Sequence, residues 1–159
     1  MQKSDYVTIL IGSLGKKVEI LDKIIDKNKV QGIILAAEKV SADDFERNLE
    51  EKSVLIEDIS NLDNGFEEVY NRIKDEITNN KELYADEIKQ LQELITIITE
   101  KSNTIQIQEK RNRDLAEKQF TVVKDRIRKV QTGTKVANQY YQNMAKLNYV
   151  PPQFMDKKK

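Results

Sequence analysis

The side chains of this chain that could carry chemistry are of few kinds. The 159 residues include no cysteine and no histidine, which excludes the usual zinc sites, thiol nucleophiles, disulfides and imidazole proton transfer. Carboxylates, lysines and tyrosines remain, and adjacent carboxylates occur at Asp43 with Asp44 and at Glu67 with Glu68. Neighbouring residues on a helix point about 100 degrees apart, so neither pair converges easily on one substrate. We therefore expect a protein that is not an enzyme, with no cofactor and no metal.

Three long stretches carry residues at alternating steps of four and three, which is the spacing of a coiled-coil seam. These seams run over residues 7–35, 45–77 and 84–105, and only five glycines and two prolines are available for turns. Leu55, Leu62 and Val69 widen the second seam beyond what a two-stranded coil buries. The expected fold is all-α: an elongated antiparallel helical hairpin or three-helix coiled-coil bundle, with a short C-terminal amphipathic helix. A homodimer of hairpins also fits this pattern.

Local signals place the helix boundaries. Asp5 is the expected N-cap of a first helix that ends near residue 39, and Ser41 with Asp44 forms a capping box for the second. The second and third helices are expected over about residues 42–78 and 81–131. Three glycines weaken the first helix and could let a neighbouring helix approach closely: Gly12, Gly15 and Gly32.

Polar residues interrupt the seams in two ways. Four occupy seam positions, where they either fix register or oligomeric state or lie at the seam edge with their heads in solvent: Asn28, Lys52, Asp63 and Ser102. In addition, residues 108–114 contain no apolar side chain over two helical turns. The simpler interpretation of this run is a solvated stretch of a paired helix, and the alternative is a hinge where the seam opens.

The net charge is zero, but the charge is distributed unevenly. Residues 1–40 carry seven basic and five acidic side chains, residues 41–100 carry six and 17, and residues 101–159 carry 14 and five. An acidic middle on the same slender body would repel phosphates, so we expect no nucleic-acid partner. Antiparallel folding that brings the basic third helix beside the acidic second is the simpler use of this asymmetry.

The start of the chain gives an expectation about location. Its short apolar run is interrupted by charges at Lys3, Asp5, Lys16 and Lys17, so neither a secretory signal nor about 20 uninterrupted apolar residues are present. We expect a cytoplasmic protein without direct membrane insertion.

The last segment differs from the rest, which suggests a body over residues 1–133 and a binding tail over residues 134–159. Charge density falls after Gly133, and apolar residues recur at steps of four, four and three before Pro151 and Pro152 end the pattern. Tyrosine and methionine are favoured at adaptable interfaces, so this segment could bind a partner helix or pack on its own bundle. The candidate binding residues are Val136, Tyr140, Tyr141, Met144, Leu147, Tyr149, Phe154 and Met155.

Three stretches of this chain resemble the flagellar export chaperone family FlgN, in its Gram-positive anaerobe form. They are the run from Ser41 to Ile59, the Leu-Asp-Asn-Gly-Phe-Glu-Glu-Val-Tyr run over residues 62–70, and the string from Tyr141 to Lys159. The resemblance implies a helical-hairpin cytoplasmic chaperone that holds hook-filament junction proteins of the FlgK and FlgL kind. It would prevent their premature assembly and deliver them to the flagellar type III export gate, using its C-terminal part for the client.

Two other functions remain open for the same residues. A chaperone of the FliT kind, which serves the filament cap protein, has a similar short helical plan. A non-catalytic coiled-coil adaptor or structural protein would show the same heptads, and its partner binding would not depend on residues 134–159.

Overall fold

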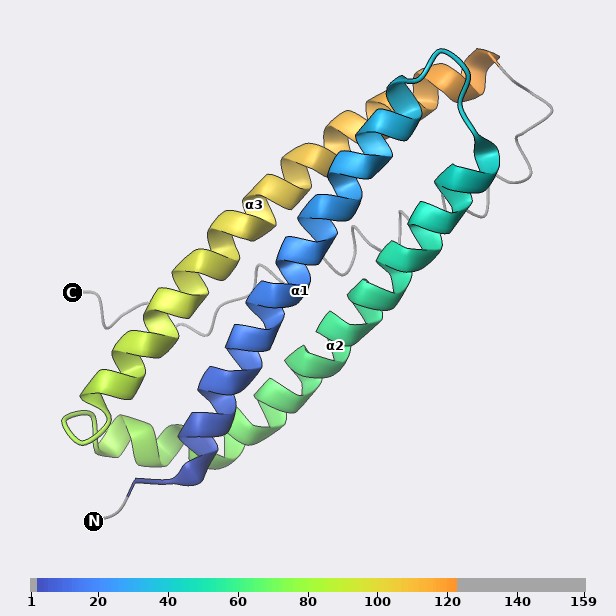
Figure 1. Cartoon of the computed structure of the whole chain (residues 1–159). Helices are drawn as coiled ribbons and strands as arrows, with labels where there is room; N and C mark the ends of the chain where they lie inside the picture. The colour runs from blue at the N-terminus through green and yellow to red at the C-terminus, as the bar shows by residue number, and fades with distance from the viewer. Residues whose placement is uncertain (1–2, 123–159) are drawn as a thin grey trace.

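The computed structural model describes residues 3–122, and these form three long helices (Figure 1). Helix α1 spans Asp5–Ala36, α2 spans Ala42–Asn79 and α3 spans Ala85–Val122. No strand occurs in this part of the chain. The expected all-α fold is confirmed, whereas the C-terminal amphipathic helix and the division at residue 133 lie outside the described residues.

The helices run up, down and up along one rod. Lys27 pairs with Glu51 while Lys17 pairs with Asp63, so α1 and α2 are antiparallel. Asp22 pairs with Lys101, and residues of α1 keep a nearly constant offset from their partners on α3, so these two helices are parallel. We call the end with the N-terminus and the 80–84 turn proximal, and the end with the 37–41 connection distal (Figure 1).

Helix α1 is the central element, because it packs against both α2 and α3 while these two approach each other much less closely (Figure 1). The expectation that the basic third helix lies beside the acidic second is therefore wrong. Within its described bounds, α3 carries six basic and seven acidic residues, so the positive charge of the last third lies mainly beyond Val122. In the ion pair between Lys52 and Glu109, the basic residue lies on α2 and the acidic residue lies on α3, which is the reverse of the expected charge arrangement.

The helix ends follow the expected chemistry with one correction. Ser41 caps α2, since its Oγ accepts a hydrogen bond from the backbone N–H of Asp44. Ser4, rather than Asp5, caps α1 and accepts from the N–H of Tyr6, which places Asp5 in the first turn where its charge favours the positive helix end. Helix α1 ends at Ala36, three residues before its expected end near residue 39. Helix α3 begins at Ala85, four residues after its expected start at about residue 81.

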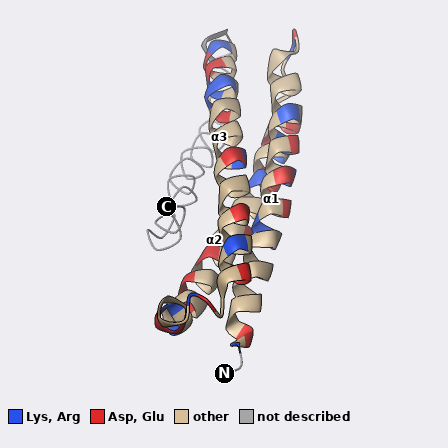
Figure 2. Ribbon diagram, turned by 90° about the vertical axis from the view of Figure 1, so that its left-hand side faces the viewer, with Lys and Arg blue, Asp and Glu red and all other residues tan. Residues whose placement is uncertain are grey.

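Helix α2 bends in its last part. In Figure 1 its final turns run across the foot of α1, and Figure 2 shows them nearly end-on. Gly65 is the only glycine of α2, and glycine is one of the residue types at which helices bend. The bend lets Tyr70, Ile73 and Ile77 join the core at the proximal end.

The core confirms most of the seam positions. All seven residues expected in the third seam are buried, from Tyr84 just before α3 to Ile105, and most of those expected on α2 are buried as well. On α1 five of the nine expected positions are buried, and the other four are only partly buried: Ile11, Val18, Ile25 and Gly32. Because a helix between two partners uses a broader contact face, its buried set is shifted beside the expected seam. It includes four residues outside the expected seam: Leu10, Lys17, Ile24 and Gln31.

Candidate functional site at the distal end of the bundle

All eight binding residues predicted from sequence, Val136 to Met155, lie outside the described residues. The structure therefore defines what they are attached to. Helix α3 carries the chain to the distal end of the rod, next to the 37–41 connection and the start of α2 (Figure 1). This end is the candidate functional site, because the segment with the predicted binding residues follows from it in the chain.

A layer of polar side chains crosses the bundle before the distal end. Its members are buried and come from all three helices: Asn28, Gln31, Asn48, Lys52, Gln108, Glu109 and Asn112. We call this set the polar layer. It corrects the expectation of a solvated stretch over residues 108–114, since three residues of that run are buried in the helix interface.

Side-chain amides connect the layer through hydrogen bonds. Asn112 Nδ2 donates to Gln31 Oε1 at 3.1 Å, and Gln31 Nε2 donates to Asn48 Oδ1 at 3.1 Å, so the chain of bonds reaches from α3 through α1 to α2. Asn28 Nδ2 donates to Gln108 Oε1 at 3.2 Å. Because each bond requires one alignment of the helices, the layer fixes their register.

The same amides also bond to the backbone of α1. Gln108, Asn112 and Asn48 donate to the carbonyl oxygens of Ile25, Asn28 and Lys27, respectively. These are helical carbonyls that receive a second hydrogen bond from a neighbouring helix. The contacts hold α2 and α3 at fixed heights on α1.

A buried ion pair completes the layer. Lys52 Nζ donates to Glu109 Oε1, and the two side chains are only 2% and 4% exposed. Burial lowers the pKa of Lys52, and the charge and hydrogen bond of Glu109 oppose this shift. Snorkelling at a seam edge, which the sequence also allowed, is therefore wrong for Lys52, and it is equally wrong for the buried Asn28 and Ser102.

Asp63 is the one polar seam residue that does lie at an edge. Its carboxylate accepts from Lys17 Nζ at 2.7 Å, and its side chain remains 30% exposed. Burial is the largest influence and raises the pKa of Asp63, while the charge and hydrogen bond of Lys17 act in the opposite direction.

Gly32 lies in the layer beside the side chain of Asn112 on α3. A Cβ atom at this position would lie 3.2 Å from Asn112 Oδ1, so the expected close approach is confirmed for Gly32. Gly12 and Gly15 have open space around the corresponding position, so the same expectation is wrong for them.

The polar layer divides the hydrophobic core into two parts. The larger part fills the proximal side from Val7 to Ile105. The smaller part, which we call the distal cluster, consists of Leu35, Phe45, Leu49 and Ala116, with three partly buried neighbours. The distal end therefore buries much less apolar surface and is the part of the rod that opens at the lowest cost.

The proximal end is tied together by Tyr84. Its buried hydroxyl accepts from the backbone N–H of Ser4 at 2.8 Å and donates to Glu76 at 2.5 Å, which joins α1, α2 and the turn before α3. Lys3 pairs with Glu87 beside this contact. The two ends of the rod thus differ. Hydrogen bonds and an ion pair join the helices at the proximal end, whereas the hydrophobic core at the distal end is small.

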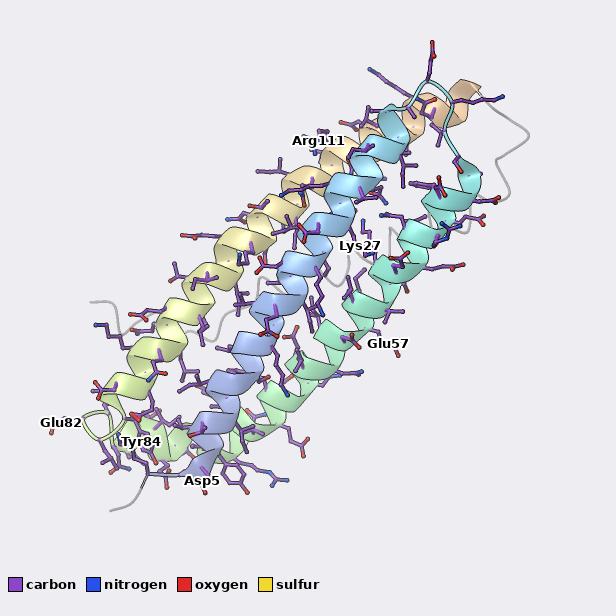
Figure 3. All side chains as sticks on the ribbon, viewed as in Figure 1. Asp5, Lys27, Glu57, Glu82, Tyr84 and Arg111 are labelled. Atoms are coloured by element: carbon purple, nitrogen blue, oxygen red, sulfur yellow. The ribbon has the colours of Figure 1, made fainter. Side chains whose placement is uncertain are left out.

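Two of the adjacent carboxylates noted in the sequence form ion pairs on the helix surface. Asp44 pairs with the exposed Arg47, and Glu68 pairs with the exposed Arg72. Within residues 3–122, no three acidic side chains come together as a metal ion would require. Figure 3 shows charged side chains such as Glu57 and Glu82 pointing outward from the rod.

Sequence reasoning missed five members of the polar layer: Gln31, Asn48, Gln108, Glu109 and Asn112. A signal for part of it was present, because the steps of three and four continue through residues 105, 109, 112 and 116. The positions kept the seam rhythm while the residue types changed from apolar to amide and carboxylate.

Comparison with protein-family models, with curated proteins and with solved structures finds no match for this chain. Of the helices in the described part, none combines the length and the apolar character needed to cross a bilayer. The features that bear on function are therefore the rod, its distal end and the sequence that follows it.

Proposed function

We propose that this protein is a cytoplasmic export chaperone of the flagellar type III system. It would bind hook-filament junction subunits through residues 134–159, keep them from assembling early and deliver them to the export gate. The observation that carries the proposal is the separation of roles along the chain. The described body uses its buried polar groups to hold its own helices, while the tyrosines and methionines suited to an adaptable interface follow beyond Val122.

The residues that resemble the FlgN family support the proposal as parts of a helical body. In the run over residues 62–70, Asp63 pairs with Lys17 on α1. Phe66 stacks on Tyr70 with ring centroids 6.1 Å apart, and Tyr70 is buried in the core. These residues fix α2 against α1, as a supporting rod for a binding segment requires.

The mechanism we propose is the binding of helices. Val136, Tyr140, Met144 and Leu147 form one apolar face at steps of four, four and three, and this face would cover an amphipathic segment of the client. Coverage of this kind prevents polymerisation without nucleotide or covalent chemistry. The rod would then carry the client to the export gate.

A pull-down from the cytosol of a flagellated host tests the proposal. The full chain should retain a junction subunit, and a chain that ends at Gly133 should lose it. Recovery of the filament cap protein instead would favour a chaperone of the FliT kind. Recovery of the same partners by both chains would favour a coiled-coil adaptor and refute the assignment of the tail.

Two matched variants separate the apolar face from the rest of the tail. Met144→Asp with Leu147→Asp places two charges on the face and should abolish client binding. Gln139→Asp with Gln142→Asp adds the same charge at positions off the face and should leave binding intact. Equal loss in both variants would show that charge, rather than the apolar face, governs the interaction.

A further inference from the structure

The packing of the three helices leaves one side of the rod without a described element. Helix α1 contacts both α2 and α3, which approach each other much less closely. It resembles a four-helix bundle in which, among residues 3–122, no helix occupies the position diagonal to α1. We call the place opposite α1 and between α2 and α3 the fourth position.

The chain itself supplies enough residues to fill this position. Helix α3 ends at the distal end, and 37 residues follow Val122. Residues 123–133 are more than the two to eight residues with which helices in bundles are usually connected. A segment that returned from the distal end would run antiparallel to α3 and would bring the apolar residues at 136, 140, 144 and 147 alongside α2 and α3.

The distribution of charge favours α2 over α3 as the helix against which the basic residues of this segment would lie. Helix α2 carries 12 acidic and four basic residues, whereas residues 123–159 carry nine basic and two acidic ones. The described part of α3 is nearly balanced. A basic segment leaving the distal end therefore meets its opposite charge on α2.

Three carboxylates of α2 lie on the side of this helix that is turned away from α1. Glu46, Glu50 and Glu57 share one face of the helix, and none of them makes an ion pair in the described structure. Glu51, which pairs with Lys27, marks the side of α2 turned to α1, and the three lie about 100 to 140 degrees around the helix from it. Figure 3 shows Glu57 on the side of α2 away from α1.

We propose that residues 123–159 of this chain dock in the fourth position. The basic residues between Lys124 and Lys135 lie against Glu46, Glu50 and Glu57, and the apolar face that begins at Val136 lies between α2 and α3. This inference concerns the chain alone, so it holds or fails independently of the client. If the tail also binds a client, the client must displace it from α2 and α3.

Spin-label distances test the docking directly, because the chain has no cysteine and every introduced one is unique. Labels at Ser53→Cys and Asn143→Cys should give a short, narrow distance distribution, since residue 53 shares the face of Glu46 and Glu57. Labels at Val30→Cys, on the exposed side of α1, and Asn143→Cys should give a distance longer by about 10 Å, the diameter of a helix.

A charge reversal with a matched control separates docking from general effects. Glu50→Lys with Glu57→Lys should broaden the 53–143 distribution, while Glu19→Lys with Asp26→Lys should leave it narrow. The control residues are also exposed, seven apart and without an ion pair, but they belong to α1. Raising the salt concentration of the unaltered labelled chain should broaden the distribution in the same way.

Three results would overturn the proposal. The first is a broad 53–143 distribution in the unaltered chain, and the second is a 30–143 distance that is equal or shorter. The third is loss of the short distance on dilution with unlabelled chain, because this would assign the fourth position to a second copy.

Discussion

The buried pair of Lys52 and Glu109 makes the most demanding prediction about the body. Replacing Glu109 with leucine leaves the ammonium of Lys52 without its counter-charge at a site where the side chain is 2% exposed. Removal of one partner from a buried ion pair typically lowers the free energy of unfolding by about 3–5 kcal/mol. We expect the Glu109→Leu and Lys52→Met variants each to fall in this range.

The double variant Lys52→Met with Glu109→Leu should behave differently. Replacing both charges with apolar residues of similar size removes the desolvation cost together with the attraction, and such replacements are often neutral or stabilising by about 1–4 kcal/mol. The double variant should therefore unfold at a higher urea concentration than either single variant. Urea titrations followed by circular dichroism at fixed pH measure all three.

The pH dependence provides an internal check on the single variant. Burial lowers the pKa of Lys52 in the folded chain below its ordinary value of 10.5, and loss of Glu109 removes the two influences that raise it. Below 10.5 the unfolded Glu109→Leu chain then binds more protons than the folded one. Its free energy of unfolding should rise as pH increases toward 10.5.

The exposed pair of Lys27 and Glu51 serves as the control, with side chains 36% and 42% exposed. Lys27→Met should change the free energy of unfolding by less than about 1 kcal/mol. If Glu109→Leu cost no more than this control, the polar layer would not be a buried network and the reasoning would fail.

Three other predictions concern the helices and their ends. Gly12→Ala should stabilise the chain by up to about 1 kcal/mol in thermal unfolding, and Gly32→Ala should gain less, because its Cβ would press on a hydrogen-bonded amide; an equal gain would contradict the close approach. The pKa of Asp63 is raised above 3.8, so just above that pH the folded chain binds more protons than the unfolded chain. The free energy of unfolding, measured by urea titration relative to Asp63→Asn, should therefore fall as pH rises from 3.8. An increase in this free energy over the same pH range would contradict the raised pKa. Tyr84→Phe leaves the N–H of Ser4 without its acceptor and should cost about 1–3 kcal/mol, with faster amide exchange at the proximal end; unchanged exchange would place the fastening of that end elsewhere.

Much of the body could be predicted from sequence because heptad spacing responds directly to burial. The seam of α3 from Tyr84 to Ile105 matches the structure throughout, and the cap at Ser41 follows from local chemistry. The central place of α1 was not predicted, since a seam of standard width does not reveal how many partners a helix has. Burial of Leu10 and Ile24 beside the expected seam is the consequence.

The burial of the polar layer was missed for a different reason, although the seam spacing continues through residues 109 and 112. A residue such as Glu109 has the composition of a solvated helix surface, and burial becomes acceptable only because Lys52 meets it from another helix. The same holds for Asn112, whose Nδ2 donates to Gln31 and to the carbonyl of Asn28. The spacing can show that such a residue lies on the seam, but partners 57 or more residues apart in the chain cannot be identified from local sequence.

The central claim is that recognition of a client resides in the segment after Gly133, supported by a three-helix rod. Calorimetric titration of a purified hook-filament junction subunit into the full chain, and into the chain that ends at Gly133, tests this most directly. We predict saturable binding to the full chain and no detectable heat with the shortened one, while the shortened chain still shows the helical spectrum of the three-helix body. Equal affinity for the two chains would contradict the account.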